Sequence, residues 1–463
     1  MHPSQTTATA LSPTRRWTVL AVCASALFLV GLDTTVVTVA LPAVGDGLQV
    51  DPGQLAWVVD AYTVPFAGLL ITSGALADRF GRRRVFCTGL VIFAAASLAC
   101  ALAPTAGMLV TARAVQGVGA SMLSPVALAI VVNVITEPRE RALAVGVWGS
   151  VFGLSTAVGP VAGGLLTDTV GWQGVFWINI PLVAAALALV ARFVPESRAG
   201  QPRRPDIPGQ LLLTLLLVCG VGLLIEGPRL GWSSPVTVTA VLVLVVTVPV
   251  FVLTSSRRAE PLLDPGLFRF LPFTGAVVSA VVVFTAFSVM LVLTTVLLQD
   301  AYGWSATAAG TAALPAALGA FVGAPVSGLL VGRTGAGTPL LVSGACLAAG
   351  GLLLSVAAGD GGVDRVLLSA GCLLTGTGVG LSSSPLTTTA VNSLPADRAG
   401  VAGGVTSTAR QVGTAVGAAV AGALAAGGPG AWTGTLVTAA CGVVVIVVTL
   451  ICCRSGNSHC GPR

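Results

Sequence analysis

The stretch GALADRFGRRR, residues 74–84, decides how the rest of the chain is interpreted. It lies between two long apolar segments, and its four arginines must therefore lie outside the hydrocarbon of a membrane. Arginine excess in a short loop is typical of the cytoplasmic side. Gly74 and Gly81 predict a backbone that turns tightly and approaches a neighbour, while Asp78 adds one negative charge among the arginines. A plain positively charged anchor is the simplest alternative interpretation.

The composition indicates a membrane protein before any motif is considered. Of the 463 residues, 55% are hydrophobic and 9% are charged, and the mean hydropathy is +0.94. A soluble domain has about a quarter of its residues charged. The ten cysteines show no spacing typical of metal ligands, so we expect no metal site and interpret them as small core residues.

Apolar stretches of about twenty residues, long enough to cross ~30 Å of hydrocarbon as helices, recur along the chain. We therefore expect an all-α polytopic membrane protein with about fourteen transmembrane helices. The expected parts are a cytoplasmic tail (1–16), an N-terminal six-helix bundle (17–193), a cytoplasmic linker (194–208), two inserted transmembrane helices (209–254), a second cytoplasmic linker (255–272), a C-terminal six-helix bundle (273–453) and a cytoplasmic tail (454–463).

The arginines test this topology, because all 23 basic residues are arginine. With a cytoplasmic N-terminus, nineteen fall in cytoplasmic segments and only Arg229 and Arg365 fall in outer loops. Arg113 and Arg410 fall within spans. We therefore expect both termini in the cytoplasm and a multi-pass protein of the plasma membrane. The net charge of +6 then faces the inner leaflet, so it sets the topology and does not indicate nucleic-acid binding.

The chain also contains an internal repeat. The pattern of residues 74–81 recurs at 328–335, an offset of 254, and two other short segments recur in the same order at offsets of 258 and 259. These offsets leave room for two extra helices between two six-helix units. Parallel repeats of this kind occur in membrane transporters. The second copy lacks the acid, since Gly332 stands where Asp78 stands in the first.

Residues 74–84 resemble the loop signature of the major facilitator superfamily, which joins its second and third membrane helices. The resemblance implies a gating role for this loop, and it extends over essentially the whole chain. The residues that carry the signature are Gly74, Asp78, Arg79, Gly81 and Arg82.

Three further motifs resemble the fourteen-helix drug/proton antiporter branch, the QacA/EmrB-like proteins. Residues 32–42 (LDTTVVTVALP) resemble its first-helix signature, with Thr38 where asparagine is usual. A motif on the fourth helix resembles the one associated with proton coupling, and one on the fifth resembles the exporter motif, with Ser155 in place of its leading glycine. The fourth- and fifth-helix motifs consist of Arg113, Gln116, Gly117, Gly119, Gly159, Pro160, Gly163 and Gly164, whose glycines we expect to pack helices closely.

The resemblance implies proton-coupled efflux of hydrophobic, cationic drugs or antibiotics by alternating access across a bacterial cell membrane. The implied partners are the small drug substrate, protons and the lipid bilayer. The energy source is the proton gradient, with no cofactor, and the implied state is a monomer. A dedicated exporter of an endogenous secondary metabolite, giving self-resistance, is the alternative within transporters.

Proton coupling needs a group that binds and releases a proton while substrate competes for its site, and a carboxylate in low dielectric suits this. Asp33 and Asp60 are the candidates. Counting from the helix ends at 1.5 Å per residue puts Asp33 about 13 Å and Asp60 about 9 Å below the outer face, with Arg113 at similar depth. We expect the three to form a proton and substrate site, with a fixed structural ion pair as the alternative.

Other charged residues rank below these three. Glu226 lies at the outer end of the first inserted helix, where an interfacial position is expected. Arg410 falls near the middle of a span, where it requires a partner or a water-filled cavity. Asp168 and Asp300 follow the ends of predicted helices, and we expect both to be solvated.

Competing classes can be weighed on the sequence. An ATP-driven pump needs a P-loop lysine, and the chain contains none. An enzyme needs a catalytic cluster, but the two histidines lie in the polar tails, so we expect a protein that is not an enzyme. A channel or a membrane sensor fits the composition but not the motifs.

Overall fold

The computed structural model describes most of the chain. The described residues are 12–50, 54–135, 137–198, 206–258, 261–359, 362–393, 399–425 and 428–454.

Helices account for nearly all of the described residues, as the long apolar segments require in a solvent that offers the backbone no hydrogen bonds. The N-terminal half contains α1 (Pro13–Leu48), α2 (Ala56–Phe80), α3 (Arg82–Ala101), α4 (Ala106–Ser121), α5 (Ser124–Val134), α6 (Pro138–Val170), α7 (Gly174–Trp177) and α8 (Asn179–Phe193). Between the halves lie α9 (Ile207–Leu230) and α10 (Pro235–Ser256).

The C-terminal half is helical to the same extent, apart from one small hairpin. It contains η2 (Pro265–Arg269), α11 (Leu271–Asp300), α12 (Ala306–Ala312), α13 (Leu314–Thr334), α14 (Gly337–Ser355), β1 (Ala358–Gly359), β2 (Gly362–Val363), α15 (Arg365–Asn392), α16 (Ala399–Ala425), η4 (Gly428–Thr435) and α17 (Leu436–Arg454). The two strands pair antiparallel, Ala358 with Val363.

Twelve segments of the described chain are long and apolar enough to cross a membrane. This confirms the expected all-α polytopic class. Two other long helices, α6 with 33 residues and α16 with 27, are not among the twelve.

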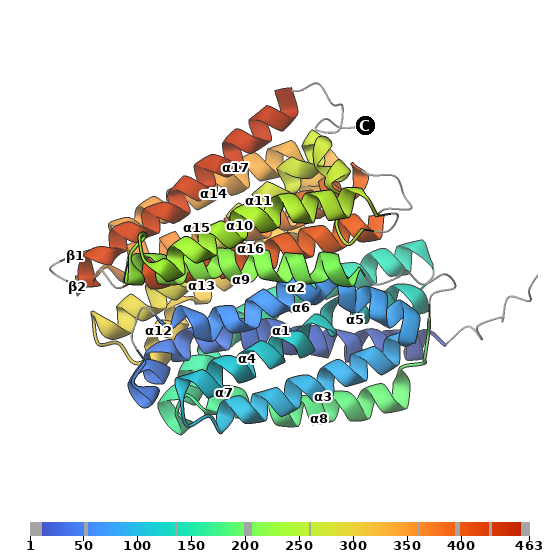
Figure 1. Ribbon diagram of the computed structural model, residues 1–463, viewed down its shortest axis with the longest axis horizontal. Coiled ribbons are helices and arrows are strands. Elements are labelled where there is room, and N and C mark those ends of the chain that lie inside the picture. Colours follow the sequence, from blue (N-terminus) through green and yellow to red (C-terminus); the bar gives the residue numbers. More distant parts are fainter. Residues whose placement is uncertain are drawn as a thin grey trace, which may run out of the picture.

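The two halves form separate groups of helices that lie side by side (Figure 1). Helices α1–α8, blue to green, occupy the lower part of the view, and α11 and α14–α17 occupy the upper part, while α12 lies at the level of α1. Helices α9 and α10, in green, run along the junction, where α9 packs on α2 of one half and α16 of the other.

Hydrogen bonds of α9 attach it to the N-terminal half. Near its start, Gln210 Nε2 donates to Gly68 O over 2.8 Å, and Thr72 Oγ1 donates to Gln210 Oε1. Near its end, Trp57 Nε1 donates to Glu226 Oε1 over 3.0 Å. Its contact with α16 is apolar, through a cluster that includes Val221 and Ala415 of the two helices. Helix α9 therefore makes its polar contacts with α2, and its contact with α16 is apolar.

The predicted loop at residues 74–84 is much shorter than expected. Helix α2 continues through Gly74 and Asp78 to Phe80, and α3 begins at Arg82, so Gly81 alone joins the two helices. The expectation of a tight turn or close approach at Gly74 is wrong, because a methyl group added there would meet nothing within 4 Å. A glycine inside a helix lowers helix stability by about 1 kcal/mol relative to alanine, and α2 nevertheless remains helical through Gly74.

Three spans predicted as single helices are each interrupted. The fourth membrane segment divides into α4 and α5 at Met122 and Leu123, just before Pro125, which has no N–H to continue the helical hydrogen bonds. The other two interrupted segments begin at Gly174 and Ala306, and each starts with a short helix, α7 or α12. The first helix also begins earlier than expected, at Pro13.

Candidate functional site

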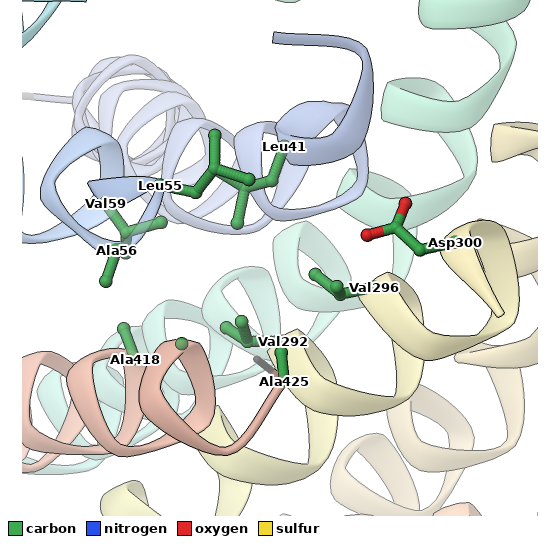
Figure 2. Close-up of a pocket in the computed structure, with 10 residues that line it drawn as sticks. Leu41, Leu55, Ala56, Val59, Val292, Val296, Asp300, Ala418 and Ala425 are labelled. Carbon is green, nitrogen blue, oxygen red and sulfur yellow. The ribbon is translucent and has the colours of Figure 1, made fainter. Parts of the chain in front are cut away.

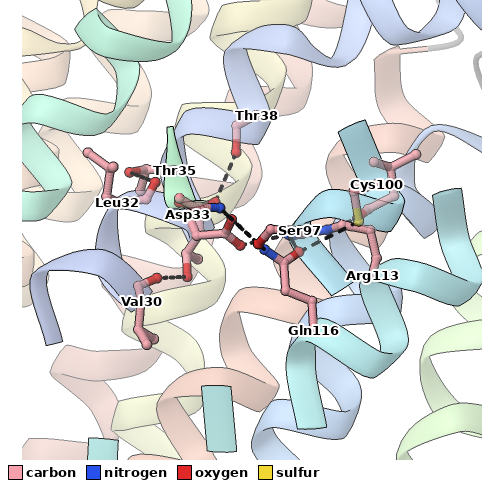
Figure 3. Close-up of polar contacts among 12 residues, drawn as sticks. Val30, Leu32, Asp33, Thr35, Thr38, Ser97, Cys100, Arg113 and Gln116 are labelled. Atoms are coloured by element: carbon pink, nitrogen blue, oxygen red, sulfur yellow. Dashed lines mark hydrogen bonds and ion pairs between the residues drawn. The ribbon is translucent and has the colours of Figure 1, made fainter. Parts of the chain in front are cut away.

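A buried ion pair between Asp33 of α1 and Arg113 of α4 lies inside the N-terminal half (Figure 3). Arg113 Nη1 donates to Asp33 Oδ2 over 2.6 Å. The exposed fraction is 1% for the arginine side chain and 0% for the aspartate, so bulk water screens neither charge. The similar depth deduced from helix length is therefore correct for these two residues.

Neutral polar side chains complete the shell of this ion pair. Gln116 Nε2 donates to Asp33 Oδ1 over 2.9 Å, and Asn179 Nδ2 donates to the same oxygen over 2.8 Å. Gln116 also donates to Ser97 Oγ, and its Oε1 accepts from Arg113 Nη1. Five residues from α1, α3, α4 and the start of α8 thus form one network, which we call the Asp33 cluster: Asp33, Ser97, Arg113, Gln116 and Asn179.

Aromatic rings and one backbone carbonyl hold Arg113 in place. Its Nε donates to Val58 O of α2 over 3.0 Å. Its guanidinium lies 4.3 Å from the ring centre of Tyr62 and 5.8 Å from that of Phe176. Such cation–π contacts strengthen when both groups are desolvated. The arginine is therefore fixed from α2 as well as from α1 and α4.

The cluster stabilises the negative charge of the Asp33 carboxylate. Three donors converge on the Asp33 carboxylate, and charge-assisted bonds of this kind are roughly twice as strong as neutral ones. Removing one member of a buried ion pair costs about 3–5 kcal/mol, because the remaining charge has no partner. Loss of the Asp33 charge would therefore leave Arg113 buried without an opposite charge.

Asp60 does not join the Asp33 cluster, contrary to the expectation that all three charged residues form one site. It lies on α2 and is fully buried, but its Oδ1 accepts only from Thr63, over 3.1 Å. Its Oδ2 has no hydrogen-bond partner among the described residues.

The helical register explains this separation. Ala56 and Ala67, four residues before and seven after Asp60, contact Gly422 and Thr408 of α16. Residues at this spacing share a face, so Asp60 lies on the side of α2 that meets the C-terminal half. Val58 and Tyr62, which contact Arg113, lie on a different side.

The sequence profile described as Major Facilitator Superfamily matches residues 23–418, most of the chain. The chain belongs to this superfamily. It is 38% identical over 400 residues to the multidrug resistance protein Stp of Mycobacterium tuberculosis, covering 86% of this chain and 74% of that protein. It is 36% identical over 413 residues to the tetracenomycin C resistance and export protein of Streptomyces glaucescens, covering 89% and 76%. It is 38% identical over 424 residues to the puromycin resistance protein pur8 of Streptomyces alboniger, covering 90% and 83%.

Solved structures share the fold of this superfamily member. A POT family transporter bound to a thioalcohol-conjugated peptide superposes with a TM-score of 0.68 at 17% identity, covering 94% of this chain and 95% of that one. The human organic anion transporter MFSD10 superposes with a TM-score of 0.64 at 17% identity, covering 95% and 100%. At this identity the similarity concerns the fold. The chain is a multi-span helical membrane transporter of the Major Facilitator Superfamily.

The superfamily's loop signature is organised around Gly81. Asp78 accepts from Arg82 Nη2 over 2.9 Å, an ion pair one turn apart that crosses the glycine. Gly81 has φ +110°, and a methyl group there would lie 2.7 Å from Glu196 Oε1. Glu196 accepts in turn from the backbone N–H of Arg83 over 3.1 Å. The linker after α8 therefore caps α3, a role that sequence reasoning missed. Arg79 stacks on the neighbouring Phe80 ring, 5.5 Å from its centre.

The motif glycines bring helices into backbone contact. A methyl group at Gly117 would collide with Tyr62 O of α2, and one at Gly119 would lie 2.7 Å from Phe93 N of α3. On α6, Gly159 and Gly163 face α1 in the same way. Gly164 meets Ala306 of α12 in the other half, while Gly310 of α12 meets Pro160 O.

The halves are joined at one end of the molecule, which is the outer end in the topology predicted from the arginines. Asp168 of α6 was expected to be solvated, but its carboxylate also accepts from the backbone N–H groups of Ala306 and Thr307, over 3.2 and 2.8 Å. Gln299 Nε2 of α11 donates to Val39 O of α1 over 3.0 Å. An apolar cavity of about 30 Å³ also lies between the halves, with Asp300 at one side (Figure 2). It is lined from both halves, by Leu41, Leu55, Ala56, Val59, Val292, Val296, Asp300, Ala418, Gly422 and Ala425.

The two remaining candidates lie outside the Asp33 cluster. Glu226 pairs with Arg229 over 2.9 Å and accepts from Trp57, as suits the outer end of α9. Arg410 lies on α16 among residues of the C-terminal half.

Sequence reasoning missed two members of the cluster. Asn179 and Ser97 are single neutral polar residues inside apolar runs, and neither was expected to lie in the site with Asp33. The available signal was the side-chain amide of Asn179 inside an apolar segment, because burying an amide is costly unless it is hydrogen-bonded. Gln116 was expected to pack helices, whereas it bridges Asp33 and Arg113.

Proposed function

We propose that the chain is a proton-coupled exporter of drugs or antibiotics, with the Asp33 cluster as its proton-binding site. The observation that carries this is the fully buried carboxylate of Asp33, which shares Arg113 and two amides in a region without bulk water. Relatives over most of the chain are multidrug and antibiotic resistance or export proteins. The same proposal includes a plasma-membrane location, the fourteen-helix branch, two cytoplasmic termini and a monomer driven by the proton gradient without a cofactor.

The proposed cycle depends on the charge of Asp33. When Asp33 is ionised, it holds Arg113 and joins α1 to α4. A proton arriving from the acidic outside neutralises Asp33, frees Arg113 and loosens this joint while substrate leaves. Loss of the proton to the cytoplasm restores the pair. Asp60, on the side of α2 that meets α16, is the second acid of the proposed exchange, because a change of its charge acts directly on the contact between the halves.

The gating loop is proposed to contact the C-terminal half in one of the two access states. Asp78, Arg82 and Gly81 lie at the cytoplasmic ends of α2 and α3 in the proposed topology. In the described residues, Asp78 bonds within its own half, while the outer ends of the halves are in contact. We propose that Asp78 engages the C-terminal half when those outer ends separate.

Dissipating the proton gradient tests the function. In everted membrane vesicles containing the protein, puromycin should accumulate when a proton gradient is imposed. A protonophore should reduce accumulation to the level of vesicles without the protein. Accumulation that survives the protonophore would rule out proton coupling.

A dedicated exporter of one secondary metabolite is the second candidate. The tetracenomycin C resistance and export protein, 36% identical to this chain, favours it. Vesicle uptake of several unrelated drugs distinguishes the two, because a dedicated exporter would accumulate one chemical class alone.

A further inference from the structure

Arg410 is a charged residue deep inside α16 that the proposed proton site does not use. It lies eleven residues after the start of this helix at Ala399, which corresponds to about 16 Å along the axis. That distance is near half the ~30 Å thickness of a hydrocarbon layer. An arginine at this depth must face other protein groups or a water-filled cavity.

The contacts of Arg410 hold its guanidinium in place without neutralising it. Nη2 donates to Ser383 O over 3.2 Å and to Thr387 Oγ1 over 2.9 Å, both on α15. The guanidinium carbon lies 5.5 Å from the ring centre of Phe284 on α11. Nε is buried without a hydrogen-bond partner among the described residues.

The contrast with Arg113 shows what is missing at Arg410. Arg113 has the Asp33 carboxylate at 2.6 Å. Among the described residues, no carboxylate lies within ion-pair distance of Arg410. The guanidinium therefore keeps a full positive charge that no carboxylate of the described residues neutralises.

Part of the surroundings of Arg410 is polar and exposed. Arg410 is partly exposed, and Thr387 beside it is exposed, as is Ser407 one turn earlier on α16. An arginine inside a membrane faces other protein groups or a water-filled cavity, and the exposed atoms of Arg410 and Thr387 lie together on one edge of α15 and α16. A guanidinium binds a carboxylate through paired hydrogen bonds and also stacks on aromatic rings, so Arg410 beside Phe284 suits an anion attached to an aromatic group.

We propose that Arg410 and Phe284 form a substrate subsite that binds the negatively charged group, a carboxylate or an ionised phenol, of an aromatic compound. Arg410 donates to the anionic oxygen, Thr387 supports the guanidinium, and the Phe284 ring contacts the aromatic part. This subsite rests on the proposed export function and specifies its substrate class, because it selects acidic aromatic compounds where the motifs alone suggest cationic drugs.

Two dyes with the same ring skeleton and opposite charge test the subsite. Equilibrium binding of fluorescein, an anion, and rhodamine 6G, a cation, is measured on the purified full chain without a proton gradient. Arg410→Gln should weaken fluorescein binding about tenfold or more, since a hydrogen bond to a charged group is lost, and change rhodamine 6G binding less than twofold. Arg410→Lys should keep part of the fluorescein affinity because it keeps the charge. Arg454→Gln, at the exposed end of α17, removes the same charge elsewhere and should leave both dyes unchanged.

Three outcomes would overturn the subsite: a parent protein that does not bind fluorescein, an Arg410→Gln variant that binds both dyes as the parent does, or one that loses both equally. Thermal unfolding of each variant shows whether equal loss comes from misfolding, and in that case Arg410→Lys and Phe284→Leu decide by the ratio of the two affinities. Because the dye-binding assay uses no proton gradient, it tests the subsite even if the protein proves not to be coupled to protons.

Discussion

Asp33 accepts from three side chains of two helices, α4 and α8, and each donor has a separate energetic role. Arg113 supplies the opposite charge, while Gln116 and Asn179 supply neutral N–H groups to the second oxygen. A hydrogen bond to a charged group contributes about 1.5–3 kcal/mol, whereas an unsatisfied buried donor costs a similar amount. The geometry of the carboxylate therefore depends on residues that carry no charge.

Replacing Asn179 measures this neutral contribution. Asn179→Ala removes one donor to Asp33 and leaves Ser97 with one fewer partner, so we expect a loss of about 1–3 kcal/mol in stability. Thermal unfolding in detergent checks it. Asn133→Ala, on the exposed side of α5, is the matched control. An Asn179→Ala variant as stable as this control would show that the amide does not support the cluster.

At the scale of elements, single glycines determine how closely helices approach. Gly117 lies against the Tyr62 carbonyl of α2, and the same segment of α2 holds Arg113 through Val58. Packing of α4 on α2 therefore positions the ion pair as well as the helices. On another face of α2, Gly68 O accepts from Gln210 Nε2 over 2.8 Å, and this bond attaches α9.

Gly117→Ala tests this packing. The added methyl group cannot be accommodated without moving backbone, so we expect a loss of about 1–3 kcal/mol and a large loss of transport. Thermal unfolding and vesicle uptake are the measurements. Gly107→Ala on the same helix has open space around the added methyl group and should behave as the parent. Equal stability of the two variants would contradict the packing role.

The sequence predicted height along helices better than rotation about them. Residue counts placed Asp33 and Arg113 at one level, since the rise per residue is constant. The same count put Asp60 at that level but could not show that it faces α16, because rotation depends on which neighbours the helix packs against. Likewise, four arginines and two glycines predicted a loop at 74–84, whereas backbone hydrogen bonding carries α2 through Gly74 and leaves Gly81 alone as the turn.

At the scale of the whole molecule, the halves touch at their outer ends through few polar contacts. The Asp168 carboxylate bonds two backbone N–H groups at the start of α12, next to the close approach of Gly164 and Ala306. Leu55 and Val296, from opposite halves, line the small cavity nearby. Opening to the outside must break these contacts, so their strength biases the equilibrium between the two access states.

Asp168→Ala should favour outward opening. We expect Leu55→Cys, in a cysteine-free background, to react faster with a membrane-impermeant maleimide when Asp168 is replaced. Asp364→Ala removes a helix cap within the C-terminal half and should not change the labelling rate. Unchanged labelling of Leu55→Cys in the Asp168→Ala protein would show that the Asp168 contact does not hold the outer ends together.

Drug-induced proton release from the purified protein tests the central claim, that Asp33 carries the coupled proton. The protein is held in weakly buffered detergent solution with a pH-sensitive dye, and puromycin is added. The parent and Asp46→Asn, a matched change at the exposed outer end of α1, should release protons. Asp33→Asn should release none. Proton release from Asp33→Asn equal to that of the parent would contradict the account.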